Sequence, residues 1–108
     1  MSVTATVLVS AKTAELVQTV QYTADRVTAL IDKFTGTNYG TTPATLRVYL
    51  VERAGTAGDD NLCAIVTVPP YGTYLFPEIV GHVLLSGGSI STIATGTISI
   101  RVSGREVS

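Results

Sequence analysis

The chain has 108 residues, of which 45% are hydrophobic and 14% are charged, and its formal net charge is −1. This length predicts one domain with a single core, and the charged fraction is well below the roughly one quarter that is usual in soluble domains. The basic residues are scattered along the chain and form no run, whereas phosphate binding requires several positive charges on one face. We therefore expect no direct nucleic-acid partner.

The sequence also limits the cellular setting. Cys63 is the only cysteine, which rules out an intrachain disulfide. Residues 1–6 lack the basic and apolar regions of a signal peptide, and no apolar run approaches the ~20 residues that cross a bilayer. We therefore expect a chain that is made in the cytoplasm and has no membrane partner.

The low charge has two interpretations. An exterior of threonine, serine and glycine suits a protein that buries much of its surface against copies of itself or against a larger assembly. The simpler alternative is a threonine-rich β-protein that is alone in solution. Composition leaves both open.

Alternating apolar and polar residues predict strands in the first half of the chain. Residues 3–11 alternate with period two and are rich in β-branched side chains. Residues 15–22 begin with good helix formers, but the β-branched residues that follow favour a strand. Residues 26–37 and 44–53 are the next two strands, and the last of these has the clearest alternation.

The second half continues in the same way. Strands are predicted at residues 62–68, 89–94 and 97–103, with a turn at Thr95-Gly96 between the last two. Together with the short run at residues 73–76, which follows the turn at Pro69-Pro70, these make about eight strands at short spacing. With no helix longer than two turns, they predict an all-β fold in one domain. We expect an antiparallel β-sandwich of the jelly-roll type.

We expect residues 68–90 to form a compact apolar crossover against which the other strands pack. Pro69-Pro70-Tyr71-Gly72 cannot continue a ladder and predicts a turn, as does Gly87-Gly88 at the far end. Pro77 interrupts any regular ladder between these turns, so we expect an irregular crossover that closes one end of the sandwich. Its apolar residues are expected to be buried, namely Leu75, Ile79, Val80, Val83 and Leu84.

Candidate chemical sites are few. Asp59-Asp60-Asn61 offers oxygen ligands for a cation, but such residues are common in loop tips for turn reasons alone. His82 could share zinc only with Cys63 and a carboxylate such as Asp59 or Glu78. A half-buried His82 that bonds a backbone carbonyl is the preferred interpretation. We predict no catalytic, cofactor-binding or metal-binding residues, and no enzyme activity.

The tyrosines allow a further alternative. Aromatic faces bind sugars in carbohydrate-binding sandwiches. Of the five tyrosines, only Tyr39 and Tyr71 are predicted to lie on loops. Packing tyrosines are the more economical explanation, and a carbohydrate-binding module remains an alternative of a different functional class.

Several segments together resemble small β-rich virion proteins of tailed bacteriophages. The segments are Ile31-Asp32-Lys33-Phe34 with Thr37-Asn38, Ala44 to Leu50, Gly72 to Leu84, Ile90 to Ala94, and Ile100 to Val107. The resemblance covers roughly residues 27–108. It implies a structural role in the virion, most simply as a decoration or cement protein that stabilises the head. A head–tail neck or tail component is the alternative within the same class.

The resemblance also implies partners. We expect a homo-oligomer, either a dimer or a trimer, that contacts the major capsid protein or other virion proteins. The expected interface residues lie on the first strand and on loop tips: Val3, Val7, Tyr39, Asp59, Asp60 and Tyr71. Residues 1–11 precede the resembling region, and we expect them to form an edge strand or a strand exchanged with a neighbouring subunit.

Overall fold

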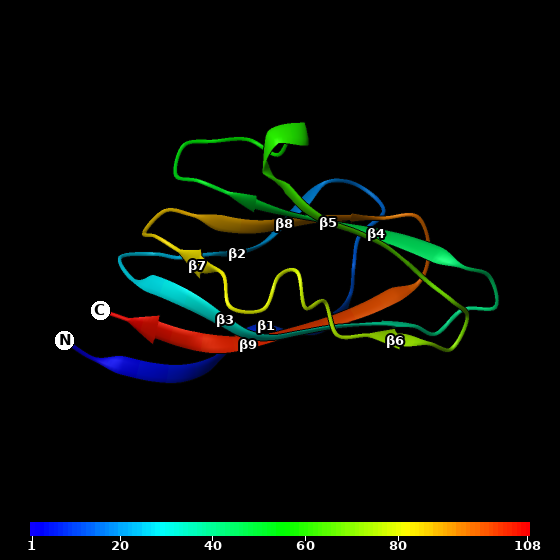
Figure 1. The fold of residues 1–108 in the computed structure, drawn as a ribbon, viewed down its shortest axis with the longest axis horizontal. Coiled ribbons are helices and arrows are strands. Elements are labelled where there is room, and N and C mark those ends of the chain that lie inside the picture. Colours follow the sequence, from blue (N-terminus) through cyan, green and yellow to red (C-terminus); the bar gives the residue numbers. More distant parts are fainter.

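The strands form two sheets that pack face to face (Figure 1). The computed structural model describes all 108 residues. The strands are β1 (Val3–Thr13), β2 (Thr19–Thr23), β3 (Thr28–Asn38), β4 (Ala44–Val51), β5 (Leu62–Val68), β6 (Thr73–Tyr74), β7 (Val83–Leu84), β8 (Ser89–Ala94) and β9 (Ile98–Val107), with a 3-10 turn, η1 (Asp59–Asn61), before β5. No helical segment is long and apolar enough to cross a membrane.

The strand order is that of a jelly roll. The first sheet has the order β1-β9-β3-β6, with β7 also beside β3, and the second has the order β2-β8-β4-β5. All pairs are antiparallel. The chain changes sheet at every connection except the β4–β5 hairpin and the β6–β7 crossover. The predicted antiparallel sandwich of the jelly-roll type is therefore confirmed.

The strand count differs slightly from the predicted eight because one edge strand is broken. β6 pairs with β3 at Thr37↔Thr73, and β7 pairs with the same strand at Leu30↔Val83. The two short strands are halves of one interrupted edge strand. Counted in this way, the sandwich has the eight strands that its sequence pattern predicts.

Most predicted boundaries hold within two residues, with two exceptions: the last strand, predicted to end at residue 103, continues to Val107, and the strand expected at residues 15–22 is much shorter. The strands at residues 62–68 and 89–94 have the predicted bounds, but the strand expected at 15–22 covers only Thr19–Thr23. The chain crosses from one sheet to the other over residues 14–18, and Glu15 O accepts a bond from Ala94 N (3.1 Å) there. Glu15 also forms an ion pair with Lys12 (2.8 Å). A segment that crosses from one sheet to the other cannot keep its hydrogen-bond ladder. The alternation of apolar and polar residues does not reveal where such a crossing occurs.

The first strand belongs to the sheet of its own chain. β1 pairs with β9 from Val3↔Val107 to Thr13↔Ser99, and it forms one edge of the first sheet. Leu8 (8% exposed) and Val9 (4% exposed) contribute to the core. In this structure residues 1–11 are thus an intrachain edge strand. Their backbone groups that face β9 are paired within the chain. Exchange with a neighbouring subunit, the alternative that the sequence suggested, is therefore not needed to satisfy these groups.

The core is a single cluster between the sheets. Alternate residues of the long strands point inward, and 20 buried hydrophobic residues form one contiguous group. An aromatic cluster lies near its open side. The rings of Phe34 and Phe76 are 4.8 Å apart, and those of Tyr74 and Phe76 are 4.9 Å apart in an edge-on arrangement. Such tilted geometries suit the quadrupoles of the rings.

The crossover between β6 and β7 fills the side of the sandwich between β5 and β3, visible in Figure 1 as the winding yellow segment. Phe76 and Ile79 are fully buried (both 0% exposed). Gly81 N donates to Ile31 O (2.7 Å), and Ile31 N donates to His82 O (3.1 Å), which fastens the crossover to β3. The crossover therefore closes a long side of the sandwich, and the prediction that it closes an end was wrong.

Other predictions for this segment were only partly right. Ile79 and Leu84 are buried as expected, but Leu75 (56%), Val80 (38%) and Val83 (50%) are largely exposed. The side chain of His82 is also exposed, not half-buried. The reason is geometric. A segment lying along the open side of a sandwich has only one face toward the core, so about half of its side chains face solvent.

The buried half of the crossover should carry most of its stabilisation. We expect Ile79→Ala to lower the free energy of unfolding by about 2–5 kcal/mol, because it removes a fully buried side chain and leaves a cavity. His82→Gln is the matched control in the same segment and should change it by less than about 0.5 kcal/mol. Equilibrium unfolding in urea measures both. Equal losses in the two variants would contradict this description of the crossover.

A side-chain bond also joins the two sheets. Tyr22 of β2 donates its hydroxyl hydrogen to Glu106 of β9, across the sandwich. Burial raises the pKa of Tyr22 well above its ordinary range, and the bond to Glu106 raises the pKa further. The folded state therefore favours the neutral phenol.

This shift predicts a loss of stability in alkaline solution. Below a pH of about 10 the phenol is neutral in both states, so its contribution is fully present there. As the pH rises above that value, the unfolded state ionises first and the contribution is lost. We expect Tyr22→Phe to be less sensitive to pH in this window than the parent chain, measured by urea unfolding at several pH values. Thr23→Ser, which leaves the phenol in place, should retain the parent slope.

Candidate interaction surfaces

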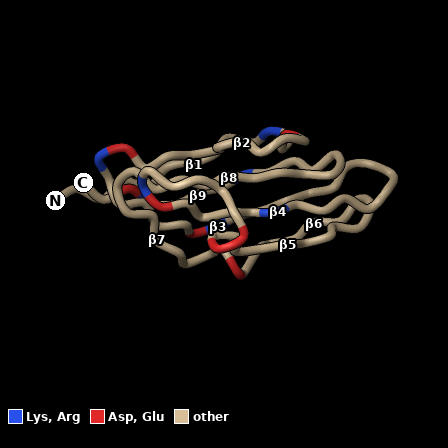
Figure 2. The backbone as a smooth tube through the Cα atoms, turned by 90° about the horizontal axis from the view of Figure 1, so that it is seen from above, with Lys and Arg blue, Asp and Glu red and all other residues tan.

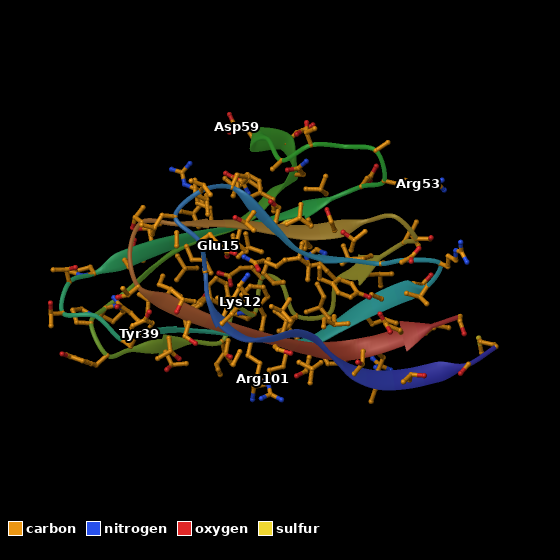
Figure 3. All side chains as sticks on the ribbon, turned by 180° about the vertical axis from the view of Figure 1, so that it is seen from behind. Lys12, Glu15, Tyr39, Arg53, Asp59 and Arg101 are labelled. Carbon is orange, nitrogen blue, oxygen red and sulfur yellow. The ribbon has the colours of Figure 1, made fainter.

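The residues predicted to form an interface are all exposed, but they lie in three separate places. These residues are Val3, Val7, Tyr39, Asp59, Asp60 and Tyr71. The two valines lie on the edge strand β1, the two aspartates lie in η1, and the two tyrosines lie in loops at one end of the long axis. Figure 3 shows Asp59 above the second sheet, and Tyr39 toward the opposite end from Arg53. No single site contains all six.

One end of the molecule has a tip without charged residues. Three connections form this tip, at residues 39–43, 69–72 and 95–97, which we call the uncharged end. None of these residues is Asp, Glu, Lys or Arg. The β1–β2 connection, which meets Ala94 beside it, carries one acidic residue, Glu15, and Glu15 is paired with Lys12. Figure 2 shows the charged residues distributed over the rest of the backbone, with this end free of them. On a molecule 46 Å long and 19 Å thick, the end is a compact surface of threonine, tyrosine, proline and glycine.

Asn38 organises the uncharged end. It is fully buried (0% exposed), and its side-chain Nδ2 donates to Thr42 O (2.8 Å) and to Val68 O (3.0 Å). Its Oδ1 accepts a bond from Gly40 N (2.8 Å). One amide thus ties the β3–β4 loop to the end of β5. The sequence predicts only a loop tip here, because an asparagine before Tyr-Gly reads as a turn residue and nothing local reveals its distant partner Val68.

The two exposed tyrosines lie on neighbouring chain segments at this end. Asn38 N donates to Gly72 O (2.9 Å), which places the following residue Tyr39 near the preceding residue Tyr71. Tyr39 is 50% exposed and Tyr71 is 73% exposed. The hydroxyl of Tyr39 bonds that of Thr13 on β1 (2.9 Å). The uncharged end therefore presents two aromatic side chains.

Tyr71 has an unfavourable backbone conformation. Its φ of 59° lies in the left-handed region, which glycine adopts freely and bulky residues avoid. The conformation arises because Gly72 N donates to Pro69 O (3.0 Å), closing a tight turn before β6. A tyrosine here costs on the order of 1 kcal/mol relative to an unstrained backbone.

Paired threonine hydroxyls continue the uncharged surface onto both sheets. Thr37 and Thr73 bond each other on the first sheet (2.9 Å), and Thr45 and Thr67 do so on the second (2.8 Å). Both pairs are cross-strand neighbours. In each pair one hydroxyl donates to the other, so this surface presents methyl groups and hydroxyls that each hold one partner within the chain.

A cleft lies away from the uncharged end. It has a volume of about 930 Å³ and lies between the β4–β5 connection and the segment from β7 to β8. Asp60, Cys63 and His82 are among its lining residues. Of the zinc candidates of the sequence, only Cys63 and His82 line this cleft, and Asp59 and Glu78 do not. No group of three or more His, Cys, Asp or Glu side chains is arranged to hold a metal ion. Glu78, the other candidate, bonds Tyr74 (2.8 Å).

The Asp59-Asp60-Asn61 segment has a local structural role. Asn61 Oδ1 accepts a bond from Gly58 N (3.0 Å), and its Nδ2 donates to Thr56 O (2.8 Å). These bonds shape the connection that leads into β5. The turn interpretation of this Asx-rich stretch therefore has a direct basis in the structure.

A shallow groove lies over the outer face of the second sheet. Its volume is about 550 Å³, and its lining includes Leu16, Arg47, Tyr49 and Ile93. Arg47 faces Ile93 on β8 and Ile65 on β5 in the strand register. Arg47 is the only charged residue among those that line this groove.

No model of a known protein family matches the chain, and neither a curated protein nor a solved structure matches it.

The role of Asn38 can be tested directly. We expect Asn38→Ala to lower the free energy of unfolding by about 1–3 kcal/mol, because it leaves buried backbone groups without partners. Thr41→Ala, at an exposed position of the same loop, should change it by less than about 0.5 kcal/mol. Urea unfolding gives the stabilities. Amide hydrogen exchange should also show faster exchange at Gly40 in the first variant, and an unchanged rate there would contradict the proposed anchoring.

Proposed function

We propose that this chain is a structural protein of a tailed-bacteriophage virion, which decorates the capsid surface and stabilises the head. In this proposal the uncharged end contacts the major capsid protein. The observation that carries it is the composition of that end, in which two exposed tyrosines lie among uncharged residues. Interface cores are depleted in charge and enriched in tyrosine in the same way.

The shape of the molecule agrees with attachment at one end. The domain is elongated, and its termini lie side by side, with Ser2 N donating to Ser108 O (3.1 Å). In Figure 1 both termini are at the end away from the uncharged loops. End-on attachment leaves the sheet faces available to neighbouring copies, and many weak contacts on a symmetric lattice add up to stable attachment.

The strain at Tyr71 supports a role in binding. The exposed side chain makes no hydrogen bond or aromatic contact within the chain, and glycine would suit its backbone better. Strained positions of this kind cluster at functional surfaces. Contact with a partner would explain why this position holds a side chain that lowers stability and forms no internal bond.

This reasoning gives a variant that separates binding from stability. We expect Tyr71→Gly to fold with unchanged or slightly higher stability, by up to about 1 kcal/mol, because it relieves the left-handed strain. Binding of the same variant to purified phage heads that lack this protein should fall at least tenfold in a co-sedimentation assay. Leu85→Ser is the control, since Leu85 is comparably exposed (71%) but lies in the β7–β8 connection, at the other end of the molecule in Figure 1. Undiminished binding by Tyr71→Gly would exclude the uncharged end as the attachment surface.

Imaging of virions would test where in the particle the chain is located. Electron cryomicroscopy of particles carrying a labelled copy of the chain should show density over the whole shell. Density at one vertex would instead assign it to the neck or tail, the alternative within the same class. Absence of the chain from purified virions would overturn the virion role altogether.

A second candidate function, carbohydrate binding, is favoured by the neighbouring positions of Tyr39 and Tyr71. Exposed aromatic faces stack on sugar rings, and paired loop tyrosines can form such a platform. A glycan array probed with the isolated chain tests this function. Saturable binding that is lost in Tyr71→Gly would favour the carbohydrate-binding module over the capsid contact.

A further inference from the structure

A sandwich has four edge strands, and three of them in this chain are protected against pairing with another strand. β1 is interrupted by two register shifts and carries Lys12 near its end. β2 has only five residues and one register shift. The β6–β7 edge is broken by the crossover that contains Pro77. Short length, bulges, charges and proline are the usual devices that prevent edge-to-edge association.

Apart from one register shift near its start, the fourth edge, β5, has none of these devices. Its seven residues, Leu-Cys-Ala-Ile-Val-Thr-Val, include no charge, no proline and no glycine. The only irregularity in its pairing with β4 lies near its start. Ile65, at the centre of the strand, is 56% exposed.

The outer side of β5 also lacks internal hydrogen-bond partners. β5 pairs only with β4, and no other backbone bond involves residues 62–67. Each outward N–H and C=O group is therefore available to another strand. A backbone edge of this kind is a ready template for strand addition.

We propose that β5 pairs antiparallel with β5 of a second copy of this chain, joining the two second sheets into one continuous sheet of eight strands. The strand sequence is compatible with itself in this arrangement. If Ile65 lies opposite Ile65 of the second copy, then Ala64 faces Val66 and Cys63 faces Thr67. Inward apolar residues meet inward apolar residues, and no charge enters the strand pair. Like residues meeting across a two-fold axis form an isologous, closed interface.

Charge placement selects the antiparallel direction. Asp59 and Asp60 are exposed in η1, immediately before β5, whereas the turn after β5, residues 69–72, is uncharged. In the antiparallel pair the aspartates of one copy lie beside the uncharged turn of the other. In a parallel, in-register pair they would face the same aspartates, and like charges at close range repel.

Apolar side chains beside β5 extend the proposed contact. β5 and the β6–β7 edge lie on the same long side of the molecule in Figure 2. Exposed apolar residues occur in the crossover, in β7 and directly after it: Leu75 (56%), Val80 (38%), Val83 (50%) and Leu85 (71%). Val83 and Leu85 line a cleft together with Cys63 of β5. Seven paired residues alone form a small contact, so burial of this apolar side is what would make the dimer stable. Scattered exposed apolar residues are normal, but a row beside an unprotected edge is not required for folding.

The β5 pair would supply the contact of the homo-oligomer that the proposed function expects. The inference itself rests on the exposed edge of β5 and does not depend on the virion role. A dimer that is absent from virions would leave this inference intact and refute that role. A chain that decorates virions but is monomeric at all concentrations would do the reverse.

The first test is the oligomeric state of the full chain, measured by sedimentation equilibrium over a range of concentrations. We expect a reversible dimer in the parent chain. Ile65→Lys should weaken dimerisation at least tenfold, because it places a like charge on both sides of the two-fold axis. Val20→Lys is the matched control. Val20 has nearly the same exposure (58%) and lies on β2, the opposite edge of the same sheet, and this variant should dimerise like the parent. Circular dichroism verifies that both variants fold.

The second test determines the register by crosslinking. In a chain with Cys63→Ser and Ile65→Cys, mild oxidation should give a covalent dimer, because directly opposite residues of an antiparallel pair lie within disulfide distance. The corresponding Cys63→Ser, Val20→Cys chain should remain monomeric under the same conditions. A strictly monomeric parent chain, a dimer that Ile65→Lys does not weaken, or crosslinking only through position 20 would each overturn the proposal.

Discussion

The structure depends on how the open side of the sandwich is closed. Two stacked sheets leave their cores accessible along both long sides, and here one side is filled by the crossover that carries Phe76 and Ile79. Pro77 between them prevents a regular strand, so the segment bends into the core where a continuous strand would lie flat beside β3. The edge strand is consequently broken into β6 and β7. Core closure and edge protection on this side are therefore one and the same structural feature.

The same closure explains the surface of this side. A chain segment that contributes Phe76 and Ile79 to the core must direct their neighbours outward, and Leu75 and Val80 are exposed for this reason. The apolar row beside β5 is thus partly a geometric consequence of the crossover. The unprotected backbone of β5 is independent of it, because nothing in the crossover requires β5 to lack charge or proline. The coincidence of the two features on one side is what makes that side a candidate interface.

The two ends of the molecule differ in chemistry for a topological reason. The jelly roll gathers alternate connections at opposite ends of the sheets, so the composition of the connections becomes the composition of the ends. At one end the connections at residues 39–43, 69–72 and 95–97 are uncharged, and Asn38 ties the first of them to β5. The fourth connection of this end, residues 14–18, carries only Glu15, which is paired with Lys12. At the other end, Arg26 and Arg53 lie in connections of mixed charge. The charged residues are consequently distributed unevenly along the long axis of the domain, although the net charge is only −1.

The sequence by itself determined the fold class and most of the strands. Period-two alternation with β-branched residues is a local signal, and strands such as Leu62–Val68 and Ser89–Ala94 follow from it without any knowledge of their partners. The turns at Pro69-Pro70 and Gly87-Gly88 are equally local, because they reflect backbone angles that few residues adopt. The exposure of Tyr39 and Tyr71 followed from their loop positions.

Only the tertiary structure decided which residues come together. Asn38 and Val68 are 30 residues apart, and their hydrogen bond depends on the strand order of both sheets. The exposure of His82 and Val83 depends on which face of the crossover meets the core. The isolation of β5 at an edge depends on the whole topology, since its own sequence would suit a central strand equally well. Alternation assigns residues to faces of a strand, but only the packing of the other strands determines which faces and edges remain exposed.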